Sequence, residues 1–242
     1  MHFHLPKPLH GWRELAGEVG IIVVGVLIAL AAEEVVESFH ERSLRSDARD
    51  SINDEISQNL DAFRRRAVVQ PCINARLLQV ERLLTSTPLN AALPRPLWIG
   101  RPQVWSVNTS RLSAATSGAR TALLSAKEQG DYAEVYSGFR DFDQAEDVEQ
   151  LAWARLRTLE TLPSLDQVSR WNLIEALHEA RYANFRILIA TAQTRSLAKG
   201  IGLTTKKSPY EEGSMSICIP MQTSRDDALK MTIRGRSPIA EP

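Results

Sequence analysis

The pattern of apolar and polar side chains divides the chain into a short head, one continuous apolar run and a long amphipathic body. The run, Val19–Ala32, holds fourteen residues without a charged or strongly polar side chain. At ~1.5 Å per residue it covers roughly 21 Å of helix, less than the ~30 Å hydrocarbon core of a bilayer. Extension to residues 15–36 gives enough length. The carboxylates that this adds are tolerated because they then lie near the headgroups, where a charge costs less. We therefore predict a transmembrane helix over residues 15–36, after a cytoplasmic head of residues 1–14.

Three interpretations of this segment stay open. An uncleaved signal anchor is the one we favour, because acidic residues precede the run and helix-favouring residues continue after it. A cleavable signal peptide is the second, since Lys7 and Arg13 precede the run and Ala29-Leu30-Ala31 matches an A-x-A cleavage site. A buried helix of a soluble domain is the third, although such a helix is rarely apolar on every face. Both signal interpretations export the rest of the chain.

After the membrane segment, apolar residues recur at helical spacing, which predicts an all-α bundle over residues 37–202. The first helix is expected to continue to Arg66, with Arg64-Arg65-Arg66 as a solvated helix end. A second helix is expected to start near Pro71. The inward face of these two helices is predicted to comprise Ala48, Ile52, Ile56, Asn59, Phe63, Ile73, Leu77, Val80 and Leu84.

Three further helices are predicted, over Ser110–Lys127, from Tyr132 to about Leu162, and from there to Lys199. Capping-box patterns at Asp131/Glu134 and Ser164/Gln167 mark the starts of the last two. For the Tyr132 helix we predict an inward face of Val135, Phe139, Phe142, Ala145, Val148, Leu151 and Leu156. For the last helix we predict an inward seam at roughly coiled-coil spacing, made of Trp171, Ile174, His178, Arg181, Phe185, Leu188 and Ala192.

Two segments depart from the helical pattern. Thr85–Pro102 contains four prolines and is expected to be an ordered connector or a binding loop, because connectors this long are uncommon within a domain. Residues 203–242 are expected to form an irregular tail. Within that tail, residues 214–221 alternate polar and apolar side chains, which is typical of a short strand.

The amino-terminal sequence HGWRELAGEVGIIVVGVLIALAAEEVVE resembles the start of a group of bacterial single-span inner-membrane proteins of unknown function. The shared features are a Trp-Arg lead, a Gly-Glu pair, a Gly-Val-Leu-Ile-Ala-Leu run and an acidic exit. The likeness covers about the first forty residues well and the body only in general layout. Where the group often has a Trp after the exit acids, this chain has Glu37-Ser38-Phe39-His40. The resemblance implies an inner-membrane anchor with an external helical domain, and it brings no activity or catalytic residue.

The amino-acid composition bears on the kind of partner that the protein binds. The chain has 29 Lys and Arg against 29 Asp and Glu, so it carries no net charge. A neutral chain argues against nucleic acid as the main partner. The abundance of Ala, Leu, Glu, Arg and Gln is typical of an all-α protein.

The two cysteines, Cys72 and Cys218, form a plausible single disulfide if the body is exported. Such a bond would tie the tail to the body. The alternative is two unrelated buried thiols.

We find no nucleotide-binding, serine-hydrolase or zinc-protease motif. Glu37 with His40 and Glu175 with His178 both match Glu-x-x-His, a pattern that di-iron four-helix bundles use twice. Against this alternative, Glu-rich helices produce the pattern by chance, and a lone seam histidine is usually a core residue. We therefore expect no cofactor.

Small residues in the apolar run are candidates for contact with another membrane helix. Gly20, Gly25 and Ala29 belong to small pairs four residues apart, which let a second helix approach closely. Glu18 is an ionisable group near the edge of the span, where reaching the headgroups is its simplest role. The expected partners are thus the bilayer and, through the span, a second copy or another membrane protein.

These observations predict a single-pass protein of the bacterial inner membrane, with most of the chain in the periplasm. Because no catalytic constellation is assembled, we expect a non-enzymatic interaction, sensory or accessory module. Two alternatives remain: a tethered di-iron-type metalloenzyme, and a small-molecule sensor with a pocket lined by Trp98, Trp105 and Trp171.

Overall fold

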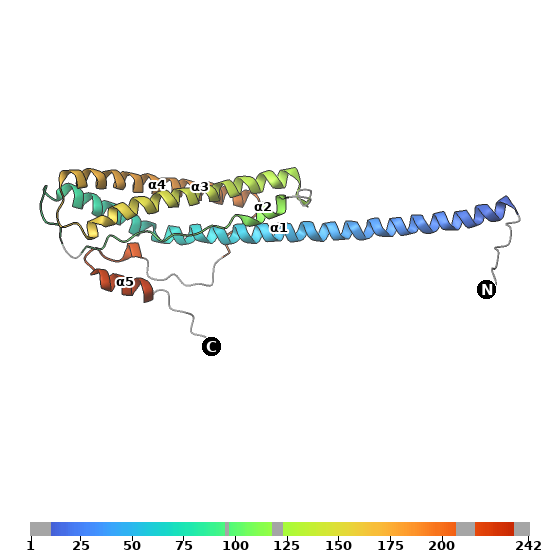
Figure 1. Ribbon diagram of the computed structural model, residues 1–242, viewed down its shortest axis with the longest axis horizontal. Helices are drawn as coiled ribbons and strands as arrows, with labels where there is room; N and C mark the ends of the chain where they lie inside the picture. Colours follow the sequence, from blue (N-terminus) through green and yellow to red (C-terminus); the bar gives the residue numbers. More distant parts are fainter. Residues whose placement is uncertain (1–10, 95–96, 118–122, 207–215, 235–242) are drawn as a thin grey trace, which may run out of the picture. The chain divides into compact units, whose positions relative to one another are not determined.

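A computed structural model describes residues 11–94, 97–117, 123–206 and 216–234. The protein is all-α, as the sequence predicted, and within those ranges its only β-type pairing is an isolated bridge between Ala92 and Ser164. Figure 1 shows the helices in chain order. They are α1 (Trp12–Ser86), α2 (Ser110–Thr116), α3 (Ala126–Leu156), the 3-10 turn η2 (Arg157–Glu160), α4 (Gln167–Gly200), the 3-10 turn η3 (Ser216–Cys218) and α5 (Arg225–Arg234).

The chain divides into two compact units, Met1–Arg49 and Asp50–Pro242. In the first unit, the described residues are the amino-terminal part of α1, and every side chain from residue 21 to residue 37 is exposed. In the described part of the chain, α1 is the one helix whose length and apolar composition suffice to cross a membrane. This agrees with the predicted apolar span.

The second unit is a bundle in which residues 50–86 of α1 pack against α3 and α4, which lie side by side (Figure 1). The α1 face predicted to point inward is confirmed from Ile52 to Leu84, while Ala48 is half-buried. The ring of Phe63 lies between two rings of α3, with its centroid 5.4 Å from that of Phe139 and 4.7 Å from that of Phe142. These contacts join the first helix to the third.

The predicted break between Arg66 and Pro71 is wrong, because α1 continues through Pro71 to Ser86. Proline removes one backbone hydrogen bond and its ring crowds the carbonyl four residues earlier. Here Pro71 and Ala67 both lie on the exposed side of α1, where water can hydrate that carbonyl. Buried Val69 and Ile73 on the opposite side hold the two halves of the helix against the same core.

Two helix starts also differ from the predictions. Ser125, not Asp131, is the N-cap of α3, and it forms a capping box with Glu128. The N-cap of α4 is Asp166, whose carboxylate accepts a hydrogen bond from the backbone of Ser169 at 2.8 Å. In both cases a capping group lies a few residues from the predicted one, so α3 begins earlier than predicted and α4 begins two residues later.

The buried face of α4 is made largely of small residues, and α3 approaches it closely at Gly138. A Cβ atom on Gly138 would lie 1.9 Å from the hydroxyl oxygen of Thr194, so the helices approach too closely there for any side chain at this position. The side chains of α4 that face the core are mostly alanine and threonine, with Leu173, Leu177, Asn184 and Ile187 between them. The predicted seam of larger residues on α4, and the inward positions of Val148 and Leu151, are therefore wrong.

The predicted strand over residues 214–221 is also wrong. Ser216–Cys218 form η3, and Ser214 and Met215 lie outside the described residues. Farther along the tail, α5 is a helix that the sequence analysis did not predict. Ser224 accepts a hydrogen bond from the backbone of Asp227 at 3.2 Å at its start, and Ala228 packs with Trp98 and Ile219.

Candidate protein-interaction surface

The outer side of α4 carries a row of exposed, largely apolar side chains at alternating steps of three and four residues. Trp171, Tyr182 and Phe185 are 64%, 62% and 56% exposed, respectively. We call the row the α4 stripe and define it as Val168, Trp171, Glu175, His178, Tyr182, Phe185 and Ile189, all of which are exposed. This spacing is that of a coiled-coil seam, in which such side chains insert between those of a second helix.

A groove between α3 and α4 lies beside this stripe. One hollow of about 640 Å³ is lined by Val148, Leu151, Ala154, Arg155, Thr158 and Glu179. A second hollow of about 370 Å³ shares Arg155 and Thr158 and extends the groove toward Leu162 and Asn172. Arg155 pairs with Glu179 across the groove, and both side chains are partly exposed, so this ion pair contributes little to stability.

The stripe and the groove together form a largely apolar surface on the bundle. Contiguous exposed apolar surface of this kind is typical of protein-interaction sites, and a groove between two helices suits an amphipathic helix. Part of this pattern was predicted, since Trp171, His178 and Phe185 belong to the predicted seam of α4. That seam was expected to face the core, but these side chains face outward.

A buried polar network holds the helices that carry this surface. The guanidinium of Arg66 donates to both carboxylate oxygens of Glu149, at 2.8 and 2.6 Å, and to the amide oxygen of Asn184 at 2.9 Å. Gln70 also donates to Asn184 at 3.0 Å. Burial raises the pKa of Glu149, and the nearby Arg66 opposes that rise. One guanidinium thus links α1 to α3 and α4.

The three consecutive arginines are therefore not a solvated helix end. Arg64 and Arg65 both pair with the buried carboxylate of Asp61, at 2.7 and 3.2 Å. The guanidinium of Arg65 also stacks over the ring of Trp105, 4.4 Å from its centroid. Asp61 lies only three and four residues before these arginines, whereas Trp105 belongs to the connector and cannot be inferred from the local sequence.

The connector from residue 97 to residue 109 is irregular but anchored, and it overlaps Thr85–Pro102, the segment expected to be an ordered connector or a binding loop. Asn59 exchanges hydrogen bonds with the backbone of Asn108 at 2.6 and 2.9 Å. Buried Glu146 accepts from the backbone N–H of Trp105 at 3.2 and 3.3 Å. Burial raises the pKa of Glu146 to about 8, against the lowering effects of that N–H and of Arg66.

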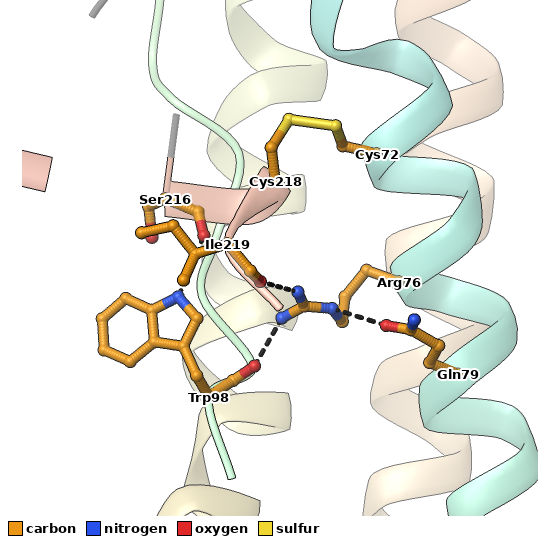
Figure 2. Close-up of a disulfide and its surroundings, with 7 residues drawn as sticks. All are labelled: Cys72, Arg76, Gln79, Trp98, Ser216, Cys218 and Ile219. Atoms are coloured by element: carbon orange, nitrogen blue, oxygen red, sulfur yellow. Dashed lines mark hydrogen bonds between the residues drawn. A yellow bond between two sulfur atoms is a disulfide. The ribbon is translucent and has the colours of Figure 1, made fainter. Parts of the chain in front are cut away.

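The disulfide between Cys72 and Cys218 is present and closes a separation of 146 residues. Figure 2 shows that it lies beside Arg76, whose guanidinium donates to the carbonyl oxygens of Trp98 and Ile219. The same guanidinium also donates to the carbonyl oxygen of Ile99. Burial lowers the pKa of Arg76 to about 10, although Glu160 acts in the opposite direction. The tail and the connector are thus both fastened to α1 at one place.

The residues proposed for a metal site are not assembled into one. Glu175 and His178 are exposed members of the α4 stripe, while Glu37 and His40 are exposed residues of the Met1–Arg49 unit. In the described part of the chain, no three His, Cys, Asp or Glu side chains come close enough to hold a metal ion.

The other predicted positions are placed as follows. Gly25 and Ala29 are exposed and Gly20 is half-buried; a Cβ on Gly20 or Gly25 would meet no atom within 4 Å. Glu18 is exposed on the same helix. Contact of these residues with another membrane helix remains a prediction.

The three tryptophans proposed for a ligand pocket do not share an environment. Trp98 and Trp105 are buried in the bundle, whereas Trp171 is exposed on α4. None of them lines the α3–α4 groove.

Comparison with known proteins gives no relative: no protein-family model, no curated protein and no solved structure matches the chain.

Proposed function

We propose that this protein is a non-enzymatic interaction module of the bacterial cell envelope, anchored in the inner membrane by residues 15–36. In this proposal, the periplasmic bundle presents the α4 stripe and the adjoining groove to an amphipathic helix of another polypeptide. The observation that carries it is the outward-facing seam, with exposed Trp171, Tyr182 and Phe185 in a row.

Two features support the placement in the envelope. The apolar part of α1 is long enough to anchor the chain in a membrane. The Cys72–Cys218 disulfide is of a kind that persists in the periplasm and is rare in the cytosol. Both agree with a bundle on the outer side of the inner membrane.

The placement is tested by labelling intact cells with a membrane-impermeant thiol reagent, with and without prior reduction. We expect labelling of both cysteines only after reduction. Thiols that react only after lysis would place the bundle in the cytoplasm and contradict the proposal.

The interaction is tested with a photo-crosslinking amino acid at position 185 of the full chain in living cells. Position 68 is the matched control, because Val68 is 52% exposed on α1 and lies outside the surface. We expect a covalent product from position 185 and none from position 68. Absence of a product at position 185, or equal products at both, would refute an interaction through the α4 stripe.

A further inference from the structure

The α4 stripe has the spacing of a helix–helix seam, but no described helix of the same chain covers it. The core side of α4 already packs against α3 and α1 through its small residues. In the tail, α5 is engaged elsewhere, because Ala228 packs with Trp98 and Ile219. Among the described helices of the chain, none is therefore left to complete the seam.

The size of the surface suits a stable protein interface. Three side chains of the α4 stripe are aromatic and more than half exposed, and an aromatic side chain can bury about 150–250 Å², so the stripe offers several hundred Å² toward the ~800 Å² that each partner of a standard interface buries. A seam of this length is completed by one helix of similar length and spacing. α4 itself has that length and that spacing.

The charges on the stripe are self-complementary. Its only ionisable side chains, apart from Tyr182, are one carboxylate, Glu175, and one imidazole, His178. The two lie three residues apart, in adjacent layers of the seam. In a two-fold interface, residue i of one copy contacts residue j of the other and the reverse contact also forms. If the two α4 helices pack antiparallel, with the axis crossing them between positions 175 and 178, Glu175 of each copy lies against His178 of the other.

Anchoring in a membrane also favours a second copy of the chain as the partner. Copies that share one membrane are confined to a plane, which raises their effective concentration relative to free domains. The chain carries no net charge, so no long-range repulsion keeps copies apart.

We propose that the α4 stripe is the interface of a homodimer, in which α4 packs on α4 of a second copy and the two Glu175 side chains pair with the two His178 side chains. This inference rests on the proposed function, because it names the partner of the same surface.

The first test measures the mass of the full chain in detergent by light scattering over a range of concentrations. Each chain has a mass of 27.0 kDa, and we expect twice that protein mass. Phe185→Ala should weaken dimerisation by roughly 10- to 30-fold, as for a central aromatic residue of an interface. The control Val68→Ala should leave it unchanged, since Val68 is exposed on α1 outside the stripe. A monomer at all concentrations, or a dimer that Phe185→Ala does not weaken, would overturn the proposal.

The second test addresses the ion pairs. Glu175→Arg and His178→Glu should each weaken dimerisation about fivefold or more, and the double variant should restore it. Both positions are exposed, so circular dichroism should report an unchanged fold. A double variant that is no better than the single ones would refute the reciprocal pairing.

The photo-crosslink at position 185 separates this inference from the proposed function. A product of twice the chain mass supports both. A product with a different protein leaves the proposed function standing and overturns the homodimer. No product at position 185 contradicts both.

Discussion

Arg66 and Glu149 form a two-bond ion pair inside the bundle, with both side chains almost completely shielded from solvent. The two residues are separated by 83 positions in the chain and join α1 to α3. A buried pair of this kind adds little net stability over well-packed apolar residues, but removal of one partner leaves the other charge buried without compensation.

Arg66→Ala is accordingly expected to lower the free energy of unfolding by about 3–5 kcal/mol. The matched control Arg64→Ala changes a nearby, partly exposed arginine whose buried partner Asp61 keeps its pair with Arg65, so it should cost only about 1 kcal/mol. Arg66→Met combined with Glu149→Leu should cost less than Arg66→Ala alone. Urea unfolding of the full chain in detergent measures all of these. A similar loss for Arg64→Ala and Arg66→Ala would show that the pair has no special role.

The sequence was sufficient to predict the all-α class, the apolar span, the disulfide and the inward face of α1. In α1 the buried residues are large and recur at helical spacing, from Ile52 to Leu84, so periodicity identifies them. In α4 the same method selected the wrong side. The tight approach at Gly138 requires small side chains on the buried face, and this leaves Trp171 and Phe185 outside. Periodicity finds a row of large residues but not the side on which the partner lies.

Hydrogen bonds and ion pairs between residues far apart in the chain could not be predicted from the sequence. Nothing near Arg66 in the sequence points to Glu149 or Asn184, and a run of three arginines is usually solvated. α5 was not predicted, although Ser224 and Asp227 have the spacing of an N-cap pair. The helix has only ten residues, and most of them are polar. The Arg66 pairings and α5 both depend on contacts that exist only in the assembled bundle.

Glu146 should make stability depend on pH. Its pKa in the folded protein is about 8, above the usual value for an unfolded chain, so the folded state binds this proton more tightly. Binding of this proton adds a few kcal/mol at most to the free energy of unfolding. The contribution is complete below about pH 4.5 and is lost as the pH rises to about 8. Glu149, whose pKa is also raised by burial, changes stability in the same direction.

Glu146→Gln should therefore flatten this dependence, since an amide keeps an oxygen acceptor for the Trp105 N–H and has no proton to lose. Urea midpoints measured from pH 5.5 to 8.5 for both proteins test this. An unchanged slope in the variant would show that Glu146 is not responsible.

Loss of the Cys72–Cys218 bond should free the tail. In chain-entropy models, a disulfide that closes a loop of this length stabilises the folded protein by about 4–5 kcal/mol. Cys72→Ser with Cys218→Ser should lower the unfolding free energy by an amount of that order and allow proteolysis between residues 216 and 234. Arg76 should delay this release, because it still holds the carbonyls of Ile219 and the connector. Arg76→Leu in the serine background should thus speed proteolysis further. Equal cleavage rates in the two backgrounds would argue against such a role for Arg76.

Gly138 and Gly130 provide a matched pair on α3. A methyl group on Gly138 would lie 1.9 Å from the hydroxyl oxygen of Thr194, so Gly138→Ala should force α3 and α4 apart and cost about 1–3 kcal/mol. Gly130 is also helical, and a methyl group there would meet no atom within 4 Å. Gly130→Ala should therefore stabilise the protein by about 0.5–1 kcal/mol through its better helix propensity.

Thr194→Ala provides the compensating change for Gly138→Ala. It removes the hydroxyl and the methyl group of Thr194 nearest to the new Cβ but leaves its own Cβ, which lies 3.0 Å away. The double variant Gly138→Ala/Thr194→Ala should thus recover part of the lost stability, and urea unfolding measures how much. If Gly138→Ala alone were as stable as Gly130→Ala, the helices would be able to separate at no cost. The close approach would then not be what places the large residues of α4 on the outside.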